Sequence, residues 1–260
     1  MNILITGTSG FLSKEFIDYF SRYNIITCDR FKLLNPNYLA TTVKENNVKI
    51  ILHTSWAGVG SGTNEDLKFN LKVQHNLESC SNLVDKIFIF GSGAEFFSEV
   101  NNYVLGKKYV NQSSKKYTNI INLRLFGCFG KHENDSRFIK NSVSRIKKHS
   151  PVIINQDKRM DFFFVEDLCR VIEYCIRNKE CPNLIDCVYE EKKTLTDIAA
   201  FLNDLFGLDP RNIQLESYNE GEQYIGDATT IESLNIQKIG LFEGIKKVYG
   251  KEAANFKSSK

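Results

Sequence analysis

Residues 1–16 read MNILITGTSGFLSKEF: a short apolar run, then glycine, then a helical pattern from Phe11 onward. Gly7 and Gly10 can make a tight turn and let the backbone approach a pyrophosphate closely. The negative charge of that group is stabilised at the positive N-terminus of the helix that follows. We therefore expect a dinucleotide-binding turn between the first strand and the first helix. Its expected cofactor contacts are Gly7, Ser9, Gly10, Phe11 and Leu12.

Three further residues bear on which dinucleotide binds. Ser13 occupies the third glycine position of such turns, where a small side chain still permits close packing of the helix. Asp29, nineteen residues after Gly10, ends the next apolar run. A carboxylate there can accept hydrogen bonds from a ribose and repel a 2′-phosphate, which favours NAD as a cofactor contacted by Asp29. Arg30 follows at once and can pair with such a phosphate, so NADP is the alternative, and an ordinary surface ion pair is another.

Apolar runs rich in Ile, Leu and Val alternate with longer amphipathic stretches. Such continuous runs are expected for strands that are covered on both faces, as in a parallel sheet with crossover helices. Helix start signals stand at Asn35-Pro36, Thr63 and Thr194. The pattern predicts an α/β fold, a doubly wound parallel sheet of the Rossmann type. The expected strands are 2–6, 24–28, 49–53, 86–90, 120–124 and 184–188.

The alternation becomes irregular after about residue 130, which predicts a second, smaller lobe. We expect a dinucleotide-binding domain formed by residues 1–130 and 160–190. A carboxy-terminal substrate-binding lobe, interleaved with it, would comprise residues 131–159 and 191–260. The aromatic run of residues 162–164 is expected in the core rather than on a surface that stacks against a base.

Composition argues against several classes of function. With 34 basic and 31 acidic residues the chain is nearly balanced, so neither nucleic acid nor an anionic membrane is expected as a partner. The first apolar run is too short for a secretory or membrane-spanning segment, which predicts a cytoplasmic protein. Seven cysteines without a Cys-x-x-Cys pair, together with four scattered histidines, predict buried reduced thiols and no metal site.

The glycine turn, the segment KIFIFGSGAEF (86–96) and the pair Tyr103-x-x-x-Lys107 together resemble the extended short-chain dehydrogenase/reductase family. Within that family, the chain is most similar to nucleotide-sugar reductases and epimerases such as GDP-fucose synthase and dTDP-4-dehydrorhamnose reductase. The resemblance implies cofactor contacts from His53 and Asn70, and a homodimer formed through helices near 63–81 and 103–116. Other segments in family order are HTSW (53–56), NLRLFGCFG (122–130), RMDFFFVEDL (159–168) and the short connection of residues 29–47, which is typical of the reductases.

Tyr103 and Lys107 lie one helical turn apart, so their side chains can approach the same small volume. A phenol, with an ordinary pKa of ~10, donates a proton to a ketone more readily when a neighbouring positive charge lowers that pKa. The resemblance implies that Lys107 also binds the nicotinamide ribose and that Ser92 orients the reacting oxygen. The expected catalytic residues are therefore Ser92, Tyr103 and Lys107.

Residues that differ from the family pattern narrow the reaction. Gly93 and Ala94 follow Ser92, where the dehydratases of the family carry an Asp-Glu pair. The cysteine and histidine with which GDP-fucose synthase epimerises correspond to Ala94 and approximately Arg137, which cannot carry protons in that role. We therefore predict reduction of a 4-keto sugar nucleotide, with 4-epimerisation as the alternative. A non-catalytic cofactor-binding protein is the alternative of another class, because only ten residues separate Ser92 from Tyr103, a short loop for the family.

The diphosphate of such a substrate needs cationic partners. Lys131, Arg137 and Arg159 are the candidates by position, and each can equally be a solvated surface charge. Gly127 stands where many relatives carry asparagine and completes the expected substrate contacts.

Overall fold

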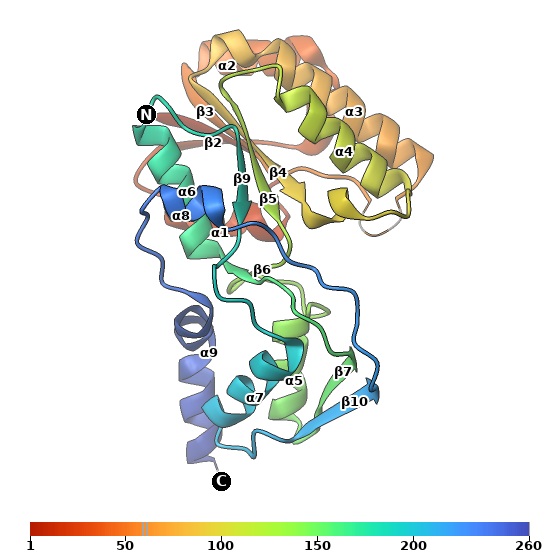
Figure 1. The fold of residues 1–260 in the computed structure, drawn as a ribbon. Coiled ribbons are helices and arrows are strands. Elements are labelled where there is room, and N and C mark those ends of the chain that lie inside the picture. The colour runs from red at the N-terminus through yellow and green to blue at the C-terminus, as the bar shows by residue number, and fades with distance from the viewer. Residues whose placement is uncertain (59, 61, 260) are drawn as a thin grey trace. The chain divides into compact units, whose positions relative to one another are not determined.

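The computed structural model describes residues 1–58, 60 and 62–259, and the chain forms two compact units (Figure 1). Unit 1 comprises Met1–Leu125 and Cys169–Cys187, and unit 2 comprises Phe126–Leu168 and Val188–Lys260. Two divisions between the units fall at the ends of strands, and the third lies inside helix α6 (Val165–Arg177). The assignment of the cofactor to one unit and the substrate to the other stays a prediction.

Unit 1 is built on a six-stranded parallel sheet with the order β2-β1-β3-β4-β5-β9. The direction of winding reverses between β1 and β3, and ligands of such sheets bind at the carboxyl ends of the strands beside this reversal. The doubly wound α/β prediction is therefore confirmed. The strands are β1 (Asn2–Thr6), β2 (Asn24–Cys28), β3 (Val48–His53), β4 (Lys86–Ser92), β5 (Ile120–Leu125) and β9 (Leu184–Cys187).

Helices cover both faces of this sheet (Figure 1). Successive side chains of β4 point to opposite faces. Ile87 and Ile89 join one apolar cluster with residues of α2, α3 and α4, whereas Phe90 contacts Phe16 of α1 with ring centroids 5.3 Å apart. Burial on both faces explains the continuous apolar runs. The helices are α1 (Phe11–Tyr19), α2 (Pro36–Glu45), α3 (Asn64–Ser79) and α4 (Asn102–Ser114), with short 3-10 helices η1 (Arg30–Leu34), η2 (Ser81–Leu83) and η3 (Gly93–Phe96).

The three expected helix starts are confirmed by their caps. The Asn35 side chain accepts hydrogen bonds from two backbone N–H groups at the start of α2. Thr63 forms a reciprocal capping box with Asp66, and Thr194 forms one with Asp197. Each cap satisfies backbone donors that a helix leaves free at its first turn. Helix α3 ends two residues earlier than expected, at Ser79, because the next residues turn into η2.

Unit 2 contains two small parallel sheets, in which β7 pairs with β10 and β6 with β8. Aromatic pairs join α7 to α9: the ring centroids are 4.3 Å apart for Phe201 and Phe242, and 5.7 Å apart for Phe206 and Phe256. The aromatic run of residues 162–164 is buried, which confirms its core prediction. The further elements are β6 (Cys128–Phe129), α5 (Phe138–Lys147), β7 (Val152–Gln156), β8 (Phe163–Phe164), α7 (Leu195–Leu205), β10 (Ile213–Ser217), α8 (Thr229–Ser233) and α9 (Leu241–Ser258).

A fully buried carboxylate, that of Asp167, joins three parts of unit 2. It accepts a hydrogen bond of 2.6 Å from the Tyr189 hydroxyl. It also accepts hydrogen bonds from the backbone N–H groups of Ile239, at 2.7 Å, and Gly240, at 2.9 Å, just before α9. The Tyr189 oxygen in turn accepts a hydrogen bond from the Phe164 backbone N–H at 3.2 Å. A buried charge of this kind is tolerated because several donors satisfy it.

Candidate active site

The turn between β1 and α1 requires glycine for two separate reasons. Gly7 has φ of +71°, and a Cβ there would lie 2.9 Å from the Cα of Ser55. Any other residue at this position would therefore be strained and would clash. Ser13, at the third glycine position, donates its hydroxyl to the carbonyls of Gly7 and Gly10, at 2.7 and 2.9 Å. The sequence predicted a small side chain here, but it did not predict these two hydrogen bonds across the turn.

The residues around this turn fit a dinucleotide. Helix α1 begins after Gly10, which has no side chain to cap its free N–H groups, and Ser9 is exposed beside it. Phe11 and Leu12, the first helical residues, are half-buried. Free donors at a helix N-terminus suit a pyrophosphate.

Asp29 and Arg30 follow β2 and are both exposed. One carboxylate oxygen of Asp29 accepts a hydrogen bond from the Phe31 backbone N–H at 2.8 Å and so caps η1. The Arg30 guanidinium lies over the Phe31 ring, 4.9 Å from its centroid. Asp29 thus has a structural role in addition to the ribose contact that stays predicted for it.

His53 and Asn70 are buried, and both side chains bind other parts of unit 1. The Nδ1 atom of His53 forms a hydrogen bond of 2.9 Å with the Thr6 hydroxyl. Burial, with a smaller effect of the Lys107 charge, lowers the pKa of His53 to about 3. The Asn70 amide both donates to and accepts from the Ala57 backbone at 2.9 Å, which holds the segment after β3. Their predicted cofactor contacts stay predictions.

Ser92, Tyr103 and Lys107 all belong to unit 1, as the catalytic prediction requires. Ser92 ends β4 and caps η3, whereas Tyr103 and Lys107 lie in the first two turns of α4. The Lys107 ammonium donates to the Phe90 carbonyl at 2.7 Å and lies 5.7 Å from the centroid of the Tyr103 ring. The pair therefore shares one side of α4, beside the end of β4, as its spacing predicted. The catalytic roles themselves stay predictions.

Lys107 is 6 % exposed, and its surroundings act against its charge. Burial lowers the pKa of this lysine to about 7, while the carboxylate of Glu95 opposes the shift. The ammonium also lies 3.7 Å from the centroid of the Trp56 ring, an arrangement in which the π face attracts a cation. Lys107 is therefore close to its own titration midpoint at neutral pH, which is the range in which a group can respond to a neighbouring proton.

Sequence reasoning missed three residues of this region: Trp56, Glu95 and Arg124. Trp56 packs edge-to-face on Tyr103 with ring centroids 6.1 Å apart, and Gly106 gives it room, since a Cβ there would lie 3.0 Å from the indole. A signal for Glu95 was available, because Ser-x-x-Glu is a capping-box spacing. A lone arginine in the apolar run of β5 was a signal for a buried ion pair.

The four expected substrate contacts lie in unit 2. Gly127 is a packing requirement, because a Cβ there would lie 2.7 Å from the Asp161 carbonyl oxygen. Lys131, Arg137 and Arg159 are exposed, and the Arg137 Nε atom lies 3.9 Å from a Glu133 carboxylate oxygen. Binding of a diphosphate by these three cations stays a prediction, and so does the alternative of solvated surface charges.

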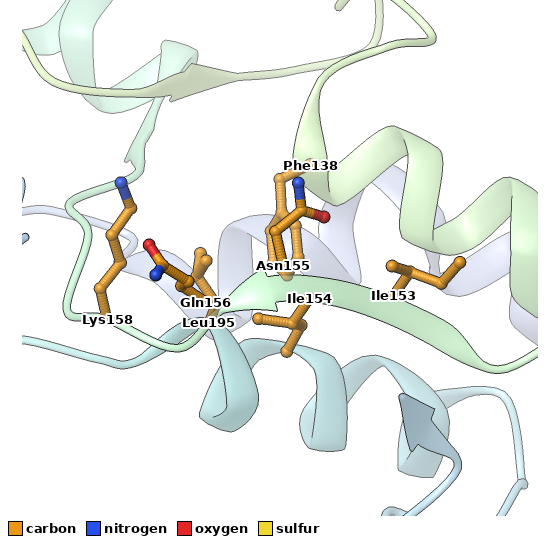
Figure 2. A pocket seen from close by; sticks show the side chains of 7 residues that line it. All are labelled: Phe138, Ile153, Ile154, Asn155, Gln156, Lys158 and Leu195. Atoms are coloured by element: carbon orange, nitrogen blue, oxygen red, sulfur yellow. The ribbon is translucent and has the colours of Figure 1, made fainter. Parts of the chain in front are cut away.

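Unit 2 also contains a pocket of about 270 Å³ beside β7 (Figure 2). Its lining mixes apolar side chains, among them the Phe138 ring, with the Asn155 and Gln156 amides and the Lys158 ammonium. Phe138 and Lys158 directly follow and precede two of the expected cations, Arg137 and Arg159. The lining residues are Phe138, Ile153, Ile154, Asn155, Gln156, Lys158 and Leu195.

Six of the seven cysteines are buried, as predicted, and Cys181 is half-buried. Within the described ranges, no three His, Cys, Asp or Glu side chains are grouped so that they could hold a metal ion. No helix in the same part of the chain combines the length and apolar character needed to cross a membrane.

Residues 3–186 match the model of the NAD dependent epimerase/dehydratase family. The chain belongs to this family. The predicted cofactor NAD agrees with this family, and the resemblance to extended short-chain dehydrogenases/reductases is confirmed as membership of it. Its closer similarity to 4-keto reductases stays a prediction. Comparison with curated protein sequences found no significant match.

Solved structures of enzymes in complex with NAD, UDP-glucose or UDP share the fold. The dTDP-glucose 4,6-dehydratase of Bacillus anthracis str. Ames, in complex with NAD, has a TM-score of 0.79 at 17% identity, with 100% of both chains covered. The UDP-glucose 4-epimerase of Thermotoga maritima, with UDP-glucose, has a TM-score of 0.79 at 16% identity, covering 97% of this chain and 99% of its own. The Bordetella bronchiseptica enzyme WbmG, with NAD and UDP, has a TM-score of 0.82 at 14% identity, covering 98% and 96%.

Proposed function

We propose that the chain is an NAD-dependent oxidoreductase of nucleotide-activated sugars that reduces a 4-keto group, with Tyr103 as the acid. The observation that supports this most is the buried Lys107 ammonium, held on the Phe90 carbonyl one turn from Tyr103. A cation in this position lowers the pKa of a neighbouring phenol and so favours proton donation. NADP is the alternative cofactor, because Arg30 is exposed directly after Asp29.

In the proposed reaction, each catalytic side chain has one task. Reduced NAD, when bound, would supply the hydride that the carbonyl carbon accepts. Tyr103 donates its hydroxyl proton to the carbonyl oxygen, and Lys107 stabilises the phenolate that remains. The Ser92 hydroxyl orients the same oxygen by a hydrogen bond. Gly7 and the start of α1 hold the pyrophosphate of the cofactor.

A 4-epimerase is the second candidate, because the family and one of the similar structures include that activity. It would use the same three side chains, with Tyr103 acting first as base and then as acid, without net consumption of cofactor. Dehydration is disfavoured because Gly93 and Ala94 cannot carry protons where the dehydratases have an Asp-Glu pair.

The pocket of unit 2 supports a nucleotide as the activating group. Its volume of about 270 Å³ suits a single ring system rather than a whole sugar nucleotide. We propose that it receives the base, with amides from Asn155 and Gln156 for the polar edge and the Phe138 ring for the flat face. Lys131, Arg137 and Arg159 remain the proposed partners of the diphosphate.

We also propose the expected homodimer. On α4, Leu105 and Tyr109 are exposed one turn apart, and Phe96, Phe97 and Val100 are exposed just before that helix. Apolar side chains gathered in this way are typical of a surface covered by a second copy.

The test mixes purified protein with NADH or NADPH and a panel of 4-keto-6-deoxy sugar nucleotides. Loss of the reduced-nicotinamide absorbance is expected, and Tyr103→Phe should reduce the rate by about 10²–10⁴-fold. Tyr109→Phe is the matched control, because this tyrosine is exposed on the same helix. Interconversion of sugars without loss of absorbance would identify the epimerase. Cofactor binding without any turnover across the panel would identify a non-catalytic binding protein.

Binding can be measured separately from turnover because Trp56 is the only tryptophan of the chain. It lies against Lys107 and Tyr103, so its fluorescence should change when NAD binds. A signal that is unchanged by saturating cofactor, together with no turnover, would contradict the proposed site.

A further inference from the structure

The Glu95 carboxylate binds the turn that carries Ser92. One oxygen, Oε1, accepts a hydrogen bond of 3.0 Å from the Ser92 backbone N–H. The other, Oε2, accepts one of 3.0 Å from Arg124 Nε, and the Glu95 side chain is 3% exposed. A carboxylate this deeply buried is costly unless its oxygens are satisfied.

The backbone of β4 makes room for this carboxylate. A Cβ at Gly91 would lie 2.7 Å from Glu95 Oε1 and 2.5 Å from Asn122 Oδ1, closer than real contacts allow. Gly91 is therefore required by space rather than by its backbone angles. Glu95 consequently occupies a site that the neighbouring strands leave open for it.

Arg124 does not serve Glu95 alone. It also donates from Nη1 to Asp186 Oδ1 at 2.8 Å, so one guanidinium serves two buried carboxylates. Burial raises the pKa of Glu95, while the Ser92 backbone N–H, Arg124 and Lys107 act against that shift. Lys107 is in turn the buried cation on which the Glu95 charge acts.

We propose that Glu95 is a positioning residue, whose carboxylate fixes the Ser92 turn and supplies the negative charge that keeps Lys107 protonated beside Tyr103. The catalytic part of this inference rests on the proposed function. The electrostatic part does not, because the charge of Lys107 can be measured without substrate.

Among residues 1–58, 60 and 62–259, the other groups that face Lys107 do not supply this charge. On β3, His53 is neutral at ordinary pH because its pKa lies at about 3. The segment after β3 contributes the uncharged Trp56 ring, and β4 contributes the Phe90 carbonyl. Tyr103, on the same helix, is the group that Lys107 is proposed to serve. Burial lowers the pKa of Lys107 to about 7, and Glu95 opposes that shift, so loss of Glu95 should lower this pKa further.

The experiment follows the carbon-13 signal of the Lys107 ε carbon against pH in protein with labelled lysine, assigned by its loss in Lys107→Met. In Glu95→Gln, the titration midpoint of Lys107 should move to lower pH. Asp186→Asn is the matched control, because it removes a carboxylate from the same arginine and should leave the midpoint in place. An unchanged midpoint in Glu95→Gln, or an equal shift in Asp186→Asn, would overturn the proposal.

A pH profile tests the catalytic consequence. Between about pH 6 and about pH 8, kcat of Glu95→Gln should fall about tenfold more than kcat of Asp186→Asn, since deprotonated Lys107 cannot assist Tyr103. Glu95→Asp, which keeps the charge, should restore much of the difference. If no substrate is turned over by the unaltered protein, the proposed function fails while the lysine titration still decides the role of Glu95.

Glu95→Gln leaves one of two buried donors unsatisfied and can prevent folding. In that case the unaltered protein supplies the test. Strongly interacting groups titrate as a pair, so the Glu95 carboxyl carbon should shift in the same pH range as the Lys107 ε carbon. A Glu95 signal that stays constant through the titration of Lys107 would overturn the proposal.

Discussion

Unit 1 and unit 2 both bury satisfied charges, but unit 1 also buries groups whose charge is only partly compensated. In unit 2, Asp167 accepts three hydrogen bonds, and Asp161 accepts hydrogen bonds from the Lys192 ammonium and a backbone N–H, both at 2.8 Å. In unit 1, burial lowers the pKa values of His53 and Lys107 and so disfavours their charged forms. Buried charges whose donors or acceptors are satisfied are costly to remove, whereas incompletely compensated groups are available for chemistry. Four measurements can break or sharpen this contrast.

The largest effect is expected for Asp167→Ala in unit 2. The substitution leaves the Tyr189 hydroxyl and two backbone N–H groups without their buried acceptor. We expect a loss of about 3–5 kcal/mol in the free energy of unfolding, measured by urea denaturation. Asp204→Ala, at an exposed position of α7, is the control and should change it by less than about 0.5 kcal/mol. Similar losses of unfolding free energy in the two variants would show that the buried Asp167 carboxylate does not stabilise unit 2.

His53 should make unit 1 sensitive to acid. Its folded pKa of about 3 lies below the ordinary value of 6.5, so the unfolded chain binds more protons between these pH values. Stability should therefore fall as pH decreases from about 6.5 towards 3, by on the order of 4 kcal/mol from this residue. His53→Gln should flatten that branch, whereas His75→Gln, at an exposed position of α3, should not. An equal fall in the free energy of unfolding between about pH 6.5 and about pH 3 in His53→Gln and in the unaltered protein would contradict this role of His53.

Lys107→Met should abolish the proposed activity and yet stabilise the fold. The pKa of Lys107 is about 7 in the folded protein and 10.5 ordinarily, so the unfolded chain binds this proton more tightly. The stability that the folded protein loses by burying Lys107 is therefore largest below about pH 7. We expect a gain of about 2 kcal/mol at neutral pH that shrinks as pH approaches 10.5, after allowance for the lost bond to Phe90. Lys72→Met, at an exposed position of α3, serves as the control. A variant that is less stable at pH 7 would show that the buried charge is fully compensated.

The smallest effect is expected at the exposed end of β2. Asp29→Ser removes the charge that would repel a 2′-phosphate, so the preference for NADH over NADPH should fall about tenfold, or by about 1.4 kcal/mol. Titration of Trp56 fluorescence with each cofactor measures this ratio. Arg30→Ala should leave NADH affinity nearly unchanged, because its guanidinium lies over Phe31. An equal ratio before and after Asp29→Ser would show that Asp29 acts only as the cap of η1.

The fold could be predicted because its two sequence signals, apolar runs and helix caps, are both local. Each expected strand of the six-stranded sheet is present to within two residues, since apolar runs between capped helices permit few other arrangements. The Tyr103 and Lys107 spacing likewise predicted a shared helix side without knowledge of tertiary contacts.

The rest of the site depends on contacts between distant segments. The Arg124 side chain joins residues 29 and 62 positions away in sequence, and Trp56 reaches Lys107 from another strand end. No periodicity encodes such contacts. One division between the two units likewise falls inside the continuous helix α6, where the sequence carries no break signal.

The short link between β2 and β3 has a consequence for how this protein can diversify. β2 is the edge of the six-stranded sheet, and only η1 and α2 return the chain from it to β3. A segment inserted after Leu34 would meet an unoccupied sheet edge on which a further strand can form. Descendants could thus enlarge the sheet outward while the strands on the far side keep their register, so growth at this edge would act on the region of Asp29 and leave the end of β4 in place.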